Sequence, residues 1–236
     1  MTVALMGSLI AGCDAAEVDE QRSGLPAVSA QASPAGPPTL SPSPLPPTSP
    51  APDKGKGTFT QVADGQTTVM GEAGTLVTYC VRVEDGINSF SPNEFATVVD
   101  AALADSRSWI ASKKWRFQRV PNCENVRLKV NLATPSTVDR NCAGAAQTVG
   151  RWSCFNNRAV HINLDRWKFG VVHAGGDLPA YRVMVVNHEV GHSLGFSHVG
   201  CPGQGKTAPI MLPQSRGLNG CVFNPYPYPD GVRYVT

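Results

Sequence analysis

No aromatic residue precedes Phe59 in this chain of 236 residues. The same stretch is rich in proline, with nine of the twenty prolines between Ser33 and Pro52. Such a composition buries too little apolar surface to offset the entropy of ordering the chain, and its prolines favour extended backbone. We therefore expect residues 14–56 to be a disordered linker and residues 57–236 to be one folded domain.

The sequence also lacks a basic cluster, an internal repeat and an apolar run of membrane-spanning length, and its formal net charge is only +2. Nucleic-acid-binding domains usually carry a clustered basic patch, so we expect no nucleic-acid partner. Neither a Gly-x-Ser-x-Gly pattern nor a P-loop is present. The sequence signals of a serine hydrolase and of a nucleotide-binding protein are therefore missing.

The first thirteen residues, MTVALMGSLIAGC, are apolar but carry no positive charge, whereas a secretory signal normally begins with one. Their end, Ile10-Ala11-Gly12-Cys13, resembles the bacterial lipobox, in which the cysteine is lipidated and becomes the mature N-terminus. We predict that residues 1–13 are a signal and lipobox segment and that Cys13 carries the lipid. The chain would touch a membrane only through this anchor. Plain secretion and a cytoplasmic location are the alternatives.

Six cysteines follow Cys13. An even number within one domain is typical of a disulfide framework, and such bridges are typical of exported proteins. No C-x₂₋₄-C spacing occurs, so we expect no structural zinc site made of cysteine pairs. We predict three bridges, two between sequence neighbours and one between the remaining cysteines: Cys142–Cys154, Cys201–Cys221 and Cys80–Cys123.

Strand patterns and helix patterns both occur in residues 57–236. Alternating or β-branched runs predict strands in GTFTQV, QTTVM, TLVTYCVRV, KWRFQRV and VRLKVNLAT, and WSCFNNRAVHINL predicts a hairpin about Asn156-Asn157. A helix is expected in SPNEFATVVDAALADS, because Ser91 and Glu94 can form a capping box. Periodicity alone therefore indicates a mixed α and β domain.

A second helix is expected in GGDLPAYRVMVVNHEVGHSLG, with Asp177 as its N-cap and Pro179 in its first turn. Nearly every face of this helix is apolar, which is typical of a helix buried in a domain. After His198 the chain is rich in glycine and proline, and we expect little regular structure there.

Only five histidines occur in the chain, and three of them lie in HEVGHSLGFSH, residues 188–198. His188 and His192 are four residues apart, so on a helix their imidazoles share one face and can reach one metal ion. Glu189 is placed to act as a general base for a water on that metal. Gly195 can end the helix, so that the chain turns and brings back His198 as a third ligand. Three protein nitrogens and a water form the open tetrahedral site of a zinc hydrolase, and we expect one Zn²⁺ per chain.

This pattern resembles the metzincin clan of zinc peptidases. The resemblance implies a methionine turn beneath the metal, for which Met211 in APIMLP is the candidate. Some metzincins carry an extra tyrosine ligand two residues after that methionine, but Pro213 stands at that position here. A closer resemblance, over about residues 57–231, is to an uncharacterised family of actinobacterial exported proteins with metzincin-like zinc motifs. The stretches YCVRVEDGI, ADSRSW, HINLDRW, VVNHEVGHSLG and FNPYPYPDG carry it.

The metzincin resemblance implies an α+β fold with a mixed twisted sheet, a buried active-site helix and an irregular Gly/Pro-rich C-terminal part. It also implies that the edge strand above the active helix pairs with a peptide or protein substrate in extended conformation. RAVHINL is the candidate for that strand.

The remaining polar candidates have simpler explanations. His161 and His173 lack metal-ligand spacing, so we interpret them as solvated or hydrogen-bonded histidines. Three aspartates are interpreted as helix caps or surface residues, and two tyrosines are weaker candidates for lining the cleft or stabilising an oxyanion. These five are Asp165, Asp177, Asp230, Tyr226 and Tyr228.

Together these features predict a monomeric zinc endopeptidase, outside the cytoplasm, either as a cell-membrane lipoprotein or as a secreted protein. Two alternatives stay open. One is a zinc amide hydrolase that acts on cell-wall peptides, and the other is a zinc-stabilised binding domain with little turnover. The intact Glu189 argues against the second alternative, because a purely structural site has no need of a general base.

The lipobox interpretation predicts the behaviour of Cys13→Ser. The variant should leave the membrane fraction, because the lipid attachment is lost, while the activity of the folded domain stays unchanged. Cell fractionation followed by immunoblotting measures the first effect. A variant that fractionates like the parent would show that Cys13 is not the anchor.

Overall fold

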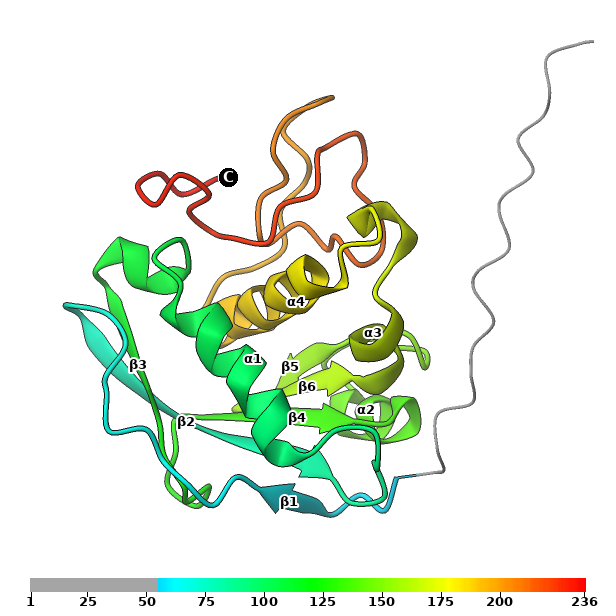
Figure 1. Cartoon of the computed structure of the whole chain (residues 1–236). Helices are drawn as coiled ribbons and strands as arrows, with labels where there is room; N and C mark the ends of the chain where they lie inside the picture. The colour runs from blue at the N-terminus through cyan, green and yellow to red at the C-terminus, as the bar shows by residue number, and fades with distance from the viewer. Residues whose placement is uncertain (1–54) are drawn as a thin grey trace, which may run out of the picture. The chain divides into compact units, whose positions relative to one another are not determined.

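A computed structural model of the chain describes residues 55–236 (Figure 1). Cys13 and residues 14–54 of the predicted linker lie outside the described residues, so the anchor and the linker stay predictions.

Six strands form one twisted, mixed sheet in the order β1-β2-β4-β6-β5, with β3 paired to the first half of β2 (Figure 1). The pairs β1–β2 and β5–β6 are antiparallel, and the pairs of β2 with β3, β2 with β4 and β4 with β6 are parallel. The strands are β1 (Phe59–Gln61), β2 (Thr75–Glu84), β3 (Trp115–Arg119), β4 (Leu128–Ala133), β5 (Cys154–Asn156) and β6 (Ala159–Asn163).

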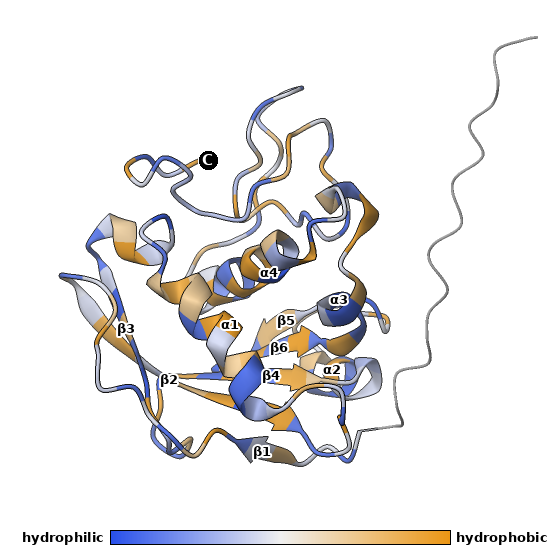
Figure 2. Ribbon diagram, viewed as in Figure 1, coloured by the Kyte–Doolittle hydropathy of each residue, from blue (hydrophilic) through white to orange (hydrophobic). Residues whose placement is uncertain are grey.

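Alternation along the central strands separates the two faces of the sheet. Val81 pairs with Val130, which in turn pairs with Val160, and all three side chains enter the main hydrophobic core. Arg82 and its register partner Asn131 are on the other face, because neighbouring side chains in a strand point to opposite sides. Figure 2 shows that these central strands are mainly hydrophobic.

Four α-helices occur in residues 55–236: α1 (Pro92–Ala104), α2 (Pro135–Cys142), α3 (Leu164–Phe169) and α4 (Leu178–Ser193). The helices α1, α3 and α4 contribute side chains to the main core on one face of the sheet, as with the edge-to-face contact of Phe95 and Trp167. The helix α2 instead packs on β5 and β6 with a second, smaller apolar cluster. Two short 3₁₀ turns complete the helical segments, Trp109–Ser112 and Val172–Ala174.

Both predicted helices are confirmed with their caps. Ser91 accepts a hydrogen bond from the backbone N–H of Glu94, and the Glu94 carboxylate accepts one from the backbone N–H of Ser91. Asp177 caps α4 by accepting a hydrogen bond from the backbone N–H of Ala180. These local polar contacts satisfy helix-end donors that would otherwise lack partners, and they fix where each helix begins.

Two strand predictions are wrong. QTTVM forms no strand, and only Met70 makes an isolated bridge, to Phe117. RAVHINL, the candidate edge strand, corresponds to β6, which is enclosed between β4 and β5. The edge is β5, the other arm of the predicted hairpin. Its turn is Asn157-Arg158, one residue later than predicted, because Asn156 still pairs with Ala159. Both turn residues have positive φ, as a type I′ turn requires.

Three disulfide bonds are present, and they are the three predicted pairs: Cys80–Cys123, Cys142–Cys154 and Cys201–Cys221. Such a set is typical of proteins from oxidising compartments outside the cytoplasm. Within residues 55–236, none of the helices is both long and apolar enough to cross a membrane. The part of the chain after α4 contains neither helix nor strand, which confirms the predicted irregular C-terminal segment.

The capping box predicts the stability of Ser91→Ala. Loss of the cap should lower the free energy of unfolding by about 1 kcal/mol, because an N-terminal N–H of α1 loses its acceptor. Ser89 is exposed two residues upstream, so Ser89→Ala is a matched control that should stay within about 0.5 kcal/mol of the parent. Urea denaturation of the three proteins measures both changes, and equal stabilities of the two variants would contradict the role of the cap.

Candidate metal centre

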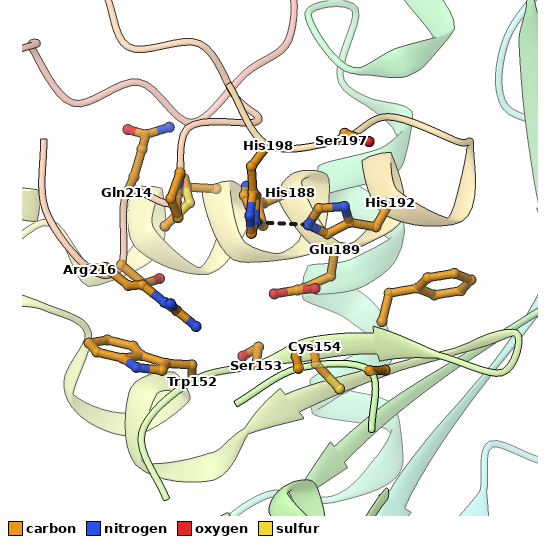
Figure 3. A pocket seen from close by; sticks show the side chains of 16 residues that line it. Trp152, Ser153, Cys154, His188, Glu189, His192, Ser197, His198, Gln214 and Arg216 are labelled. Atoms are coloured by element: carbon orange, nitrogen blue, oxygen red, sulfur yellow. Dashed lines mark hydrogen bonds between the residues drawn. The ribbon is translucent and has the colours of Figure 1, made fainter. Parts of the chain in front are cut away.

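The helix α4 fixes two of the three clustered histidines. His188 and His192 are one turn apart on α4 and project from the same side of the helix (Figure 3). The last turn of α4 before them is buried, and Tyr181 and Val186 are fully inaccessible to solvent. Packing in the core therefore fixes the position of the helix that carries the two imidazoles.

The turn after α4 returns the chain to the metal side, as the sequence predicted. The backbone N–H of Gly195 donates to the His192 carbonyl, and the N–H of Phe196 donates to the Gly191 carbonyl. These two bonds form the Schellman pattern of a helix end, and Gly195 has the positive φ, +95°, that the pattern requires. The chain then reverses, and His198 comes to lie beside His188 and His192.

The three histidines converge on one point through their Nε2 atoms. The Nε2 of His198 is 3.2 Å from that of His188 and 3.1 Å from that of His192. Two nitrogens bound about 2.0–2.1 Å from a tetrahedral zinc ion lie roughly 3.3 Å apart. The spacing of the imidazoles therefore fits a single metal ion, and this cluster is able to bind one.

The hydrogen bonds of the other ring nitrogens test this fit independently. The Nδ1 of His188 donates to the carbonyl of Ile210 over 2.7 Å, and the Nδ1 of His192 donates to the carbonyl of Phe196 over 2.9 Å. In a neutral ring the Nε2 then carries a lone pair. His198 has at most one hydrogen on its Nε2, which cannot serve both neighbours. A cation between the rings removes this conflict, so the donor set fits a metal.

All three rings are held in the neutral form that metal binding needs. Burial lowers the pKa of His188 to about 3, and its backbone acceptor Ile210 offsets part of that effect. Burial also lowers the pKa of His192 and His198, and the neighbouring His192 lowers that of His198 further. Neutral imidazole is the form that ligates metals, so no proton has to be displaced near neutral pH.

Glu189 lines the same cavity and is only 5% exposed. Its carboxylate points below the histidines, toward the edge strand at Ser153 and Cys154 (Figure 3). Burial raises the pKa of this carboxyl to about 8, and the positive charge of Arg216 partly offsets the rise. Glu189 is therefore beside the histidine cluster without belonging to its ligand set, as the sequence predicted.

Met211 lies directly under α4 and is fully buried. A Cβ atom added to Gly191 would approach its Sδ to 2.5 Å, which shows how closely the methionine approaches the helix backbone. The turn Pro209–Leu212 presents the Ile210 carbonyl to His188, while the Met211 carbonyl accepts from the N–H of Val199, next to His198. Met211 thus belongs to the support of the candidate ligands.

An aromatic cluster of Trp109, Phe196 and Tyr234, which the sequence did not reveal, holds the loop that carries the third candidate ligand, His198. The Phe196 ring lies 4.7 Å from the Trp109 ring and 5.6 Å from the Tyr234 ring. Trp109 is fully buried, and its Nε1 donates to the carbonyl of Asn187 in α4. Because the Phe196 carbonyl orients His192, this packing also orients a ligand. No periodic pattern marks Trp109 or Tyr234, so only the folded chain brings them together.

The cavity around the cluster has a volume of about 400 Å³. The edge strand β5 forms its floor with Cys154 and Phe155, preceded by Trp152 and Ser153, and Arg216 enters from the C-terminal segment (Figure 3). Sequence reasoning missed Trp152 and Arg216, because neither carries a motif.

The remaining candidates lie elsewhere. His161 is buried beside Asn131, where burial and the charge of Arg82 lower its pKa to about 4. The Nε2 of His173 donates to the Gln214 carbonyl. Asp177 is the α4 cap, Asp165 lies in the first turn of α3, and Asp230 accepts two backbone hydrogen bonds near the C-terminus. Tyr226 stacks with Arg107, and neither Tyr226 nor Tyr228 lines the cavity.

A family model described as "Protein of unknown function (DUF3152)" matches residues 45–229. The chain belongs to this family. The matched range of DUF3152 covers the whole sheet, α4, the three histidines and Met211. No curated protein matches the chain.

The close contact below α4 predicts the behaviour of Gly191→Ala. Alanine favours a helix over glycine by about 1 kcal/mol, but its Cβ would meet Met211 at 2.5 Å and Trp109 at 2.6 Å. We expect a net destabilisation of about 1–3 kcal/mol and weaker zinc retention, because the turn that supports His188 must move. Gly200→Ala, whose Cβ meets open space, is the control and should match the parent. Thermal unfolding and chelator competition measure both properties, and an unchanged Gly191→Ala variant would contradict this packing role.

Proposed function

We propose that this member of DUF3152 is a zinc-dependent peptide-bond hydrolase of metzincin type that cleaves within peptide chains outside the cytoplasm. The observation that carries the proposal is the convergence of three imidazoles, with the Nε2 of His198 3.2 Å from that of His188 and 3.1 Å from that of His192, beside the buried Glu189 and next to the sheet edge β5. His188, His192 and His198 would hold the ion. Zn²⁺ bound there would activate a water molecule and polarise the scissile carbonyl.

Glu189 is the proton carrier in this proposal. It is the only aspartate or glutamate among the residues that line the cavity, and it comes from the same helix as two of the ligands. A Zn²⁺ ion bound beside it would favour the ionised form of this carboxyl group. The carboxylate would then take a proton from the attacking water and deliver it to the leaving amine. The burial of Glu189 keeps bulk solvent from competing for that proton.

The edge strand β5 is the proposed binding surface for the substrate backbone. Among residues 55–236, β6 is its one sheet neighbour, so the other edge of β5 would be the place for strand addition next to the cavity. An extended peptide gains main-chain hydrogen bonds from such an edge. The substrate carbonyl would then pass between the floor of the cavity and the histidines.

A comparison of Glu189→Ala with His192→Ala separates the chemical role from the structural one. Glu189→Ala should keep full zinc stoichiometry and nearly the parental melting temperature, while peptide cleavage falls by about 10²–10⁴-fold, because the proton carrier is lost. His192→Ala should lose zinc as well, since one of three protein ligands is missing. Native mass spectrometry, thermal unfolding and peptide-library digestion with and without a chelator give the three readouts.

Glu189→Gln is the control for the smaller side chain of Glu189→Ala, because glutamine keeps the volume but cannot act as a base. It should match Glu189→Ala in zinc content and in loss of cleavage. Equal loss of zinc from Glu189→Ala and His192→Ala would show that Glu189 is a ligand and not a base. A parent protein that binds zinc fully but cleaves neither the peptide library nor cell-wall peptides would reject the hydrolase and favour a binding domain.

A further inference from the structure

Arg216 brings an unneutralised positive charge into the cavity beside the histidine cluster. Its side chain is exposed and points toward the space below the histidines, on the Trp152 side (Figure 3). No salt bridge to Arg216 occurs among residues 55–236.

The guanidinium is oriented without being neutralised. One Nη atom donates to the carbonyl of Gln147 over 3.2 Å, and the group lies 5.8 Å from the centre of the Trp152 ring. Arg166 lies 5.8 Å from the same ring and adds a second positive charge near this end of the cavity. A single bond to a backbone carbonyl leaves most of the five N–H donors of Arg216 for another partner.

The surroundings leave room for such a partner. Ala145 and Ala146, which precede the Gln147 carbonyl, line the same cavity with short side chains. A planar guanidinium matches the two oxygens of a carboxylate in a bidentate arrangement, and such charge-assisted hydrogen bonds are stronger than neutral ones. The cavity therefore contains a flat aromatic ring, open space and a group able to bind an anion, together with the histidine cluster.

We propose that Arg216 and Trp152 form a subsite that selects a carboxylate group of the substrate close to the bond that is cleaved. The carboxylate belongs either to an acidic side chain or to the C-terminal end of the peptide, since both present the same two oxygens. This inference rests on the proposed hydrolase function and adds the class of substrate. Arg216 acts as a specificity residue, and the chemistry stays with the histidines and Glu189.

The competing explanation is that Arg216 is only a structural link between the C-terminal segment and the loop before β5. Arg216→Gln distinguishes the two, because glutamine keeps an N–H donor for the Gln147 carbonyl but loses the charge. Arg216→Lys keeps the charge but loses the planar fork, so it should retain part of any preference for carboxylates.

The test uses acetylated, amidated alanine hexapeptides with a single glutamate at each position in turn, each paired with its glutamine counterpart. A third set repeats the glutamine peptides with a free C-terminal carboxylate in place of the C-terminal amide. The rate of cleavage by the zinc-loaded full chain gives kcat/KM for each peptide. Binding of each peptide to the zinc-loaded Glu189→Gln variant is measured by Trp fluorescence or calorimetry and gives Kd without turnover. The binding arm includes the double variant Glu189→Gln/Arg216→Gln.

We expect the carboxylate peptide to be preferred by about 10-fold over its neutral counterpart at one position, or at the free C-terminus, and the preference to weaken with added salt. The preference should vanish in Arg216→Gln and partly return in Arg216→Lys. Equal Kd values for charged and neutral peptides, or a preference that survives in Arg216→Gln, would overturn the subsite. If the parent cleaves no peptide, the hydrolase proposal fails while the binding arm still decides the role of Arg216.

Discussion

The hydrogen bonds from the Nδ1 atoms of His188 and His192 to backbone carbonyls are the interactions on which this site depends. Each bond fixes the tautomer and the rotation of its ring, so that the Nε2 lone pair faces the third histidine. Both acceptors, at Ile210 and Phe196, lie outside α4 in irregular chain. The centre is therefore formed where a rigid helix meets two loops that the core and the aromatic cluster hold in place.

The fold accounts for the location of the centre at one end of the sheet. The helix α4 packs on the same face as α1 and α3, while its histidine-bearing end reaches the cavity above β5. The sheet ends at β5, so a backbone edge and a candidate metal site face the same space. The buried carboxyl group of Glu189 and the exposed guanidinium of Arg216 both line that space, and the proposals give them separate tasks.

Much of this arrangement follows from local sequence signals, and the rest from contacts that no local signal encodes. The caps Ser91 and Asp177, the four-residue histidine spacing and Gly195 each act within a turn or two, which is why they were predictable. The hairpin of β5 and β6 was recognisable, but which arm lies outermost depends on the pairing of β6 with β4. The position of Arg216 depends on a hydrogen bond to the Gln147 carbonyl, 69 residues away in sequence. The helix α2 was missed because it is short and polar, although Thr134 and Pro135 mark its start.

The disulfides follow one another along the chain without interleaving: Cys80 with Cys123, Cys142 with Cys154, and Cys201 with Cys221. A chain that emerges from a translocation channel N-terminus first can therefore close each loop before the next pair appears. Pairing in order of emergence leads directly to the native set, with no need to reshuffle bonds between distant segments. In an exported chain the three bridges would therefore form in sequence order, and the last of them encloses Met211, under the histidines.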